Sequence, residues 1–121
     1  MGIYLSKACD RVEKESGQGG SVKYVVGEMQ GWRKNMEDAH IAVCDLDCQQ
    51  AAADEQLSIF GVFDGHGGKE VALFTKDYFV KELVSNEAFQ QKNYSLALKQ
   101  TFHRIDQVTL TIKVIMPTLI A

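Results

Sequence analysis

The chain has 121 residues, of which 45% are hydrophobic and 24% are charged, and its formal net charge is -3 at pH 7. This length supports one domain with one hydrophobic core. The composition excludes a collagen, a coiled coil and wholesale disorder, and because Lys and Arg are scattered along the chain, no nucleic acid is expected as a partner.

Residues 1–21 are predicted to form a flexible leader. Residues 7–22 are polar and contain the glycine-rich run 17–21, a composition that holds no regular backbone. The first six residues, MGIYLS, fit the pattern in which Gly2 accepts a myristoyl chain after removal of Met1. Gly2 is equally well explained as the second residue of a flexible leader. If acylated, it would give weak and reversible membrane association.

Three strands are predicted after the leader. Residues 22–29, VKYVVGEM, are rich in β-branched and aromatic side chains, and residues 30–32 are expected to turn the chain. A second strand is predicted within residues 35–45, followed by a polar loop over 46–56. Residues 57–63, LSIFGVF, are a nearly continuous apolar run, typical of a strand that is covered on both faces of its sheet.

Two helices are predicted in the second half. Apolar residues recur at helical spacing from Lys69 to Leu83, and a polar connection is expected over residues 85–93. Ser95 is a plausible N-cap for a second helix, whose apolar stripe runs to Val108. Beyond this point the sequence becomes β-branched and apolar, which indicates a change of character.

Several residues between these elements suit phosphate or metal chemistry. Asp64 follows an apolar strand, and a buried carboxylate needs a compensating cation such as a hard metal ion. Glu37 and Asp38 begin another predicted strand and would project to opposite faces, so that only one would join Asp64. Arg33 could clamp a phosphate, and His66 could transfer a proton. An ordinary turn with solvated charges explains the same spacing, and the residues alone leave both interpretations open.

The two longer motifs, QGWRKNMEDAH and FGVFDGHGG, resemble in this order the first two signatures of the metal-dependent protein phosphatase 2C family. The resemblance implies an α+β fold, a four-layer α-β-β-α sandwich of which only the N-terminal strands and two helices are present. It divides the chain into a leader (residues 1–21), the N-terminal part of a phosphatase-like domain (residues 22–107) and a divergent C-terminal tail (residues 108–121).

The resemblance also implies hydrolysis of phosphoserine and phosphothreonine in proteins by a metal-activated water. The complete family site holds two Mg²⁺ or Mn²⁺ ions. Asp64 would bridge the two ions, while Glu37 and the Gly65 carbonyl would bind one of them. Asp38 would act through a metal-bound water.

Two further residues receive catalytic roles from the same resemblance. Arg33 would hold the substrate phosphate, and His66 would protonate the departing Ser or Thr oxygen. The expected partners are therefore phosphorylated protein substrates, and the chain is expected to be an enzyme by family. The oligomeric state stays open.

The sequence also departs from the family. Later Asp motifs that complete the metal site have no counterpart after Asp77, so a truncated product is expected that is weakly active or inactive alone. The alternatives are a non-catalytic short isoform, a membrane-tethered interaction module, or a gene-model artefact. Because Cys9, Cys44 and Cys48 cannot all pair and no secretory segment precedes them, a cytoplasmic or nuclear location is expected, partly at membranes if Gly2 is acylated.

Overall fold

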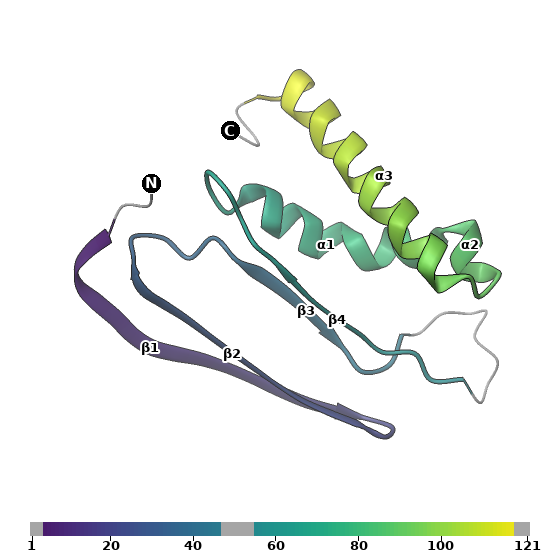
Figure 1. The fold of residues 1–121 in the computed structure, drawn as a ribbon, viewed down its shortest axis with the longest axis horizontal. Coiled ribbons are helices and arrows are strands. Elements are labelled where there is room, and N and C mark those ends of the chain that lie inside the picture. The colour runs from purple at the N-terminus through teal and green to yellow at the C-terminus, as the bar shows by residue number, and fades with distance from the viewer. Residues whose placement is uncertain (1–3, 47–54, 118–121) are drawn as a thin grey trace. The chain divides into compact units, whose positions relative to one another are not determined.

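The computed structural model describes residues 4–46 and 55–117 and divides the chain into two compact units. Among the described residues, one unit comprises residues 4–36, 41–46 and 55–61, and the other comprises residues 37–40 and 62–117. The elements in chain order are β1 (Tyr4–Gly19), β2 (Val22–Arg33), β3 (Ala39–Val43), β4 (Ile59–Phe63), α1 (Glu70–Ser85), α2 (Glu87–Gln90) and α3 (Tyr94–Ile115) (Figure 1). The expected mixture of helices and strands is therefore confirmed.

The first unit contains a long antiparallel hairpin of β1 and β2 (Figure 1). Gly20, with a φ of 55°, occupies the turn between the strands, and pairing is continuous from Gly19 opposite Val22 to Val12 opposite Met29. Side chains along most of β2 alternate between half-buried and exposed, as the two-residue period of a strand requires.

The prediction of a leader without regular structure is wrong for residues 4–19, which form β1. This strand was not recognised because its side chains do not show an apolar pattern. Those described are all exposed or half-buried, and the strand is instead held by backbone pairing with β2. The predicted turn at residues 30–32 is also wrong, since β2 continues to Arg33. Gly31 has a φ of 66°, so the backbone departs locally from the extended strand conformation at this residue.

The predicted second and third strands are confirmed in shortened form as β3 and β4, which pair in a separate two-stranded sheet. β4 was expected to be covered on both faces. Its side chains instead alternate between half-buried and exposed, and Phe60 and Val62 are exposed. The apolar run therefore indicated a strand correctly but overstated its burial.

Tyr24 on β2 and Phe60 on β4 are in aromatic contact within the first unit, with ring centroids 5.6 Å apart. The hydroxyl of Tyr24 donates a hydrogen bond to Glu15 on β1 at 3.1 Å. Partial burial, this hydrogen bond and the negative charge of Glu15 raise the pKa of Tyr24 above its usual value. The tyrosine thus joins β1, β2 and β4 in one local cluster.

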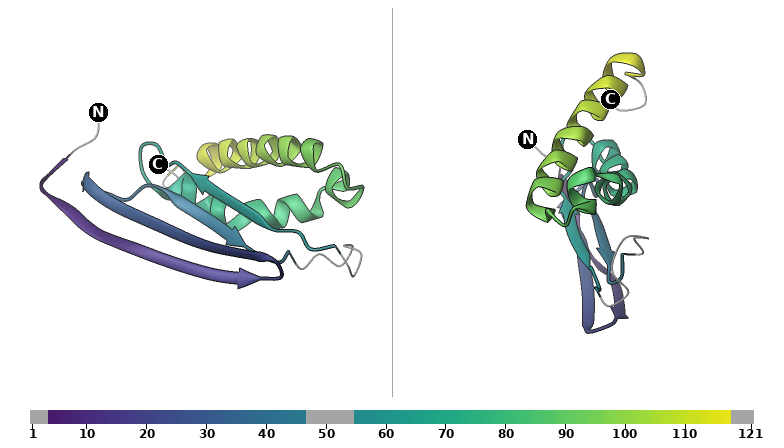
Figure 2. Two further views of the ribbon diagram at one scale, coloured as in Figure 1. Left: turned by 60° about the horizontal axis from the view of Figure 1, so that its bottom comes forward. Right: turned by 90° about the vertical axis from the view of Figure 1, so that its right-hand side faces the viewer.

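The second unit contains the helices, and its helices α1 and α3 lie side by side (Figures 1 and 2). Phe79 of α1 is buried, and its ring contacts Phe63 at 5.6 Å and Phe102 of α3 at 5.0 Å. Small side chains allow the helices to approach closely. The buried residues on the three helices are Ala72, Thr75, Phe79, Leu83, Ala88, Phe89, Ala97, Thr101, Ile105 and Thr109.

Both predicted helices are present, with changes at their ends. α3 begins at Tyr94, and its N-cap is Asn93, whose side chain accepts a hydrogen bond from the Leu96 amide at 3.3 Å. The connection predicted over residues 85–93 contains the short helix α2. α3 then runs unbroken past residue 108 to Ile115, so the sequence change there does not end the helix. Within the described ranges, no helix has the length and apolar character needed to cross a membrane.

Candidate metal and phosphate site

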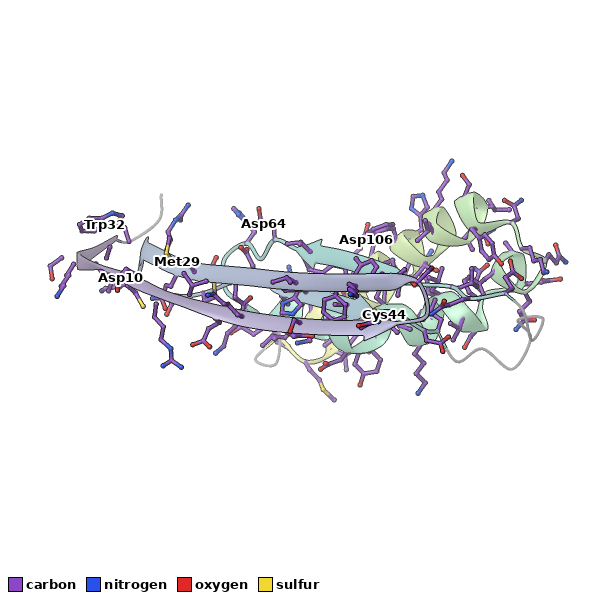
Figure 3. The ribbon with its side chains drawn as sticks, turned by 90° about the horizontal axis from the view of Figure 1, so that it is seen from below. Asp10, Met29, Trp32, Cys44, Asp64 and Asp106 are labelled. Carbon is purple, nitrogen blue, oxygen red and sulfur yellow. The ribbon has the colours of Figure 1, made fainter. Side chains whose placement is uncertain are left out.

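The DGHGG motif, residues 64–68, forms the turn between β4 and α1. Asp64 and His66 are exposed, and Figure 3 shows Asp64 where the chain leaves β4. Gly67 has a φ of 70° and Gly68 a φ of 128°, values in the left-handed region that favour glycine. The backbone of this turn therefore favours glycine at residues 67 and 68.

Gly65 makes the closest approach in this turn. A Cβ atom at this position would collide with the carbonyl oxygen of Glu37 and would lie 3.0 Å from the carbonyl carbon of Glu37 and 2.9 Å from the Gly68 oxygen. All three are backbone atoms, which cannot swing aside as a flexible side chain would. Three glycines in five residues predicted a close backbone approach, and this prediction is confirmed with Glu37 as the neighbour.

The contact between Gly65 and Glu37 joins the two motifs within the second unit. Glu37 is half-buried and Asp38 is exposed, and both directly precede β3. Asp64 was expected to be a buried carboxylate that needs a cation, and this is wrong, since Asp64 is exposed. Its hydration removes the desolvation penalty on which the expectation rested.

Arg33 and Gly2 are not part of this junction in the second unit. Arg33 is exposed at the end of β2 in the first unit, whereas Glu37, Asp38 and Asp64 belong to the second unit. The carbonyl of Arg33 accepts a hydrogen bond from the Gln30 side chain at 2.7 Å, which fixes the backbone there. Its role toward phosphate stays a prediction. Gly2 lies outside the described residues.

The donors fit part of a site for a hard cation. The carboxylates of Glu37 and Asp64 and the carbonyl of Gly65 are oxygen ligands of the kind that Mg²⁺ and Mn²⁺ prefer, and the Gly65 contact brings their backbones together. Across residues 4–46 and 55–117, however, no group of three or more His, Cys, Asp or Glu side chains is arranged to hold a metal ion. The described chain therefore offers a partial ligand set.

The sequence and the family resemblance predicted the residues of this junction, but not the close backbone approach that excludes a side chain at Gly65. Gly65 was singled out for its carbonyl, and the structure shows that its missing side chain matters as well. The only available signal was the density of glycine in the turn. The family resemblance implied that Glu37 and the Gly65 carbonyl share a metal ion, but no local pattern indicated that the Glu37 backbone itself would press against Gly65.

The family model of protein phosphatase 2C matches residues 22–116, most of the chain. Together with the two joined motifs, this match indicates the protein phosphatase class. The chain belongs to the protein phosphatase 2C family. The match starts where the predicted domain starts and extends beyond residue 107. The proposed division into leader, domain and tail otherwise stays a prediction.

Curated relatives from two lineages are similar to the chain. It is 49% identical to probable protein phosphatase 2C 4 of Paramecium tetraurelia, over 92% of this chain and 35% of that protein. Protein phosphatase 2C 1 of the same organism is 46% identical over the same shares. Probable protein phosphatase 2C 21 of Arabidopsis thaliana is 40% identical over 89% of this chain and 28% of that protein. The chain thus spans about a third of the length of the Paramecium relatives.

Proposed function

We propose that this chain contributes part of the site of a metal-dependent protein phosphatase that hydrolyses phosphoserine and phosphothreonine in proteins. The observation that supports the proposal best is the backbone of Glu37 against Gly65, which joins the two motifs that carry the family resemblance. Relatives named protein phosphatases cover most of the chain and support the same reaction class. The complete domain would be the four-layer α-β-β-α sandwich expected for the family.

Glu37, Asp64 and the Gly65 carbonyl would hold Mg²⁺ or Mn²⁺, and the complete site would take two ions. When bound, such ions acidify water and balance the charge of the phosphate. Asp38 is exposed beside Glu37 and would orient a water through hydrogen bonds. Because fewer than three ligand side chains gather in the described part of the chain, we propose that metal affinity and activity are low in this chain alone.

Arg33 and His66 would act on the substrate. The guanidinium of Arg33 can donate two parallel hydrogen bonds to phosphate oxygens, a geometry that a lysine cannot reproduce. His66 is exposed on the turn, where an imidazolium can reach the oxygen of a departing Ser or Thr. Protonation of that oxygen makes it a better leaving group.

The cellular location and the membrane association of the chain are also proposed. A cytoplasmic or nuclear location agrees with Cys9 and Cys44, which form no disulfide, and such thiols persist in a reducing compartment. Acylation of Gly2 would add a weak and reversible membrane interaction. Mass spectrometry of the chain expressed with an N-myristoyltransferase tests this part, and an unmodified N-terminus would contradict it.

Calorimetric titration with Mn²⁺ tests the metal proposal. We expect weak binding to the unmodified chain and strongly reduced binding to Asp64→Asn and Glu37→Gln. Asp106→Asn is the matched control, because it removes an exposed carboxylate on α3 that belongs to neither motif. Equal binding by the unmodified chain and Asp64→Asn would contradict the proposal, as would equal losses in Asp64→Asn and Asp106→Asn.

A non-catalytic role is the second candidate, either as a short isoform that competes for the partners of a longer phosphatase or as a membrane-tethered interaction module. The absence of a three-ligand group among the described residues favours it. Hydrolysis of p-nitrophenyl phosphate with Mn²⁺ separates the two candidates. Robust turnover that Asp64→Asn abolishes would contradict the non-catalytic role, whereas no turnover and no Mn²⁺ binding would support it.

A further inference from the structure

No strand of the described chain pairs with the outer edge of β1, and the proposed reaction involves no residue on it. β1 pairs with β2 along one edge, and these two strands form the whole of their sheet in the described chain. An edge strand presents a row of backbone N–H and C=O groups that can pair with a further strand. A two-stranded hairpin is also marginal in stability, and additional strands stabilise it.

The charges along β1 are complementary to a second copy of the same strand. Suppose that two β1 strands pair in antiparallel orientation about a two-fold axis at Val12. Arg11 then stands opposite Glu13 of the other copy, and Asp10 stands opposite Lys14, and symmetry repeats each pair. Opposite charges in directly facing positions stabilise a strand pair.

The neighbouring registers of the same pairing are unfavourable. A shift by one residue in one direction sets Asp10 opposite Glu13, and a shift in the other direction sets Asp10 opposite Glu15 and Arg11 opposite Lys14. Like charges in facing positions repel each other. The sequence of β1 therefore favours the register centred on Val12 over both of its neighbours.

Apolar side chains support the same register. Val12 and Met29 face each other across the hairpin, and they are 47% and 54% exposed. Self-pairing at Val12 would bring the two Val12 side chains together. The apolar side chains Met29, Val12, Val12 and Met29 would then form one continuous row across the four strands. Part of this exposed apolar surface would thereby leave water, which favours association.

The ion pair between Arg11 and Glu13 places both charges where a second β1 strand could reach them. Their side chains lie 2.8 Å apart and are 79% and 59% exposed, so both charges lie at the surface of the strand. In the symmetric pair they would form a four-membered network of alternating charge. The register shifts between Tyr4 and Val12 bend the strand near the axis, and we therefore expect a weak contact.

We propose that two copies of this chain associate through antiparallel pairing of β1 centred on Val12, which forms a four-stranded sheet. Both copies use the same surface, so the assembly closes as a two-fold dimer. The exposed charges make it sensitive to salt.

Sedimentation velocity on the 121-residue chain tests this inference, with a reducing agent present to exclude intermolecular disulfides. We expect reversible, concentration-dependent formation of a species of twice the 13.5 kDa chain mass, which weakens as salt is added. Arg11→Glu and Glu13→Arg are each expected to be monomeric, because each variant places like charges opposite each other across the two-fold axis. An equimolar mixture of the two variants restores opposite charges between chains and should form a heterodimer.

Within each variant, residues 11 and 13 carry like charges, so the ion pair inside one chain is lost in both. Association of the mixture can therefore arise only from opposite charges that face each other between chains. Lys23→Glu is the matched control, an exposed charge reversal on β2 opposite Gln18, and it should leave the dimer in place. Circular dichroism verifies that each variant is folded. A wild-type chain that stays monomeric, a dimer that Arg11→Glu leaves unchanged, or a mixture that fails to associate would each overturn the inference.

Discussion

Substitution of Gly65 by alanine tests the contact on which the candidate site depends. The new methyl group would collide with the Glu37 carbonyl oxygen and crowd the Gly68 oxygen, which lies at 2.9 Å. Since these are backbone atoms, relief requires a shift of the turn or of the segment before β3. Overpacking of this kind costs about 1–3 kcal/mol.

Urea unfolding followed by circular dichroism measures this cost. With a denaturant slope of about 2 kcal/mol per molar, typical of small domains in urea, a loss of about 2 kcal/mol lowers the unfolding midpoint by about 1 M. Mn²⁺ binding should fall with it, because displacement of the Gly65 carbonyl separates the proposed oxygen ligands.

Gly27→Ala is the matched control for the substitution. Its Cβ would meet only a Val12 methyl group at 4.0 Å, and alanine is less costly than glycine within a strand by roughly 0.5–1 kcal/mol. We therefore expect the control to be neutral or slightly stabilising. A Gly65→Ala midpoint equal to that of Gly27→Ala would refute the close approach of Glu37.

Three further substitutions test other parts of the structure. Thr101 is 1% exposed and its hydroxyl has no hydrogen-bond partner, so Thr101→Val should raise the free energy of unfolding by about 1 kcal/mol. The control is Thr111→Val, which removes a 2.8 Å hydrogen bond to a backbone carbonyl. This variant should give no gain in the same urea assay. Phe79→Ala should cost about 3–5 kcal/mol, because the buried ring contacts two other aromatic rings; a loss below 1 kcal/mol would contradict this packing. The pKa of Tyr24 is raised by partial burial and by Glu15, so the folded chain prefers the neutral phenol and loses stability as the pH rises above about 10. Glu15→Gln should lower the pH at which Tyr24 ionises, as measured by phenolate absorbance, and an unchanged titration would exclude the role of Glu15.

The sequence predicted best the elements whose own side chains have a characteristic composition or spacing. The β-branched and aromatic composition of β2 and the helical spacing in α1 are local patterns; β2 begins at its predicted residue but continues past residue 29 to Arg33, and α1 formed close to its predicted bounds. β1 was missed because its stability comes from pairing with β2 rather than from its own side chains. α2 was missed because it is short, although Asn86, which accepts hydrogen bonds from the Ala88 and Phe89 amides, is a typical N-cap residue.

The site was predictable in its residues but only partly in its geometry. The two motifs and their order identified the family, which the match to residues 22–116 confirms. The exposure of Asp64 could not be predicted, because it depends on which face of β4 is covered. The approach of Glu37 to Gly65 joins segments that lie apart along the chain, and no local pattern specifies such a contact.

The glycines of the DGHGG turn have a consequence for how homologues are interpreted. Gly65 is required by the neighbouring Glu37 backbone, and Gly67 and Gly68 are favoured by their dihedral angles. A descendant that lost its catalytic chemistry would keep this preference for glycine, because the same backbone connects β4 to α1. Retention of the glycines in a relative therefore reports an intact strand-to-helix connection, whereas the residues at positions 64 and 66 are the ones that would change first in an inactive relative.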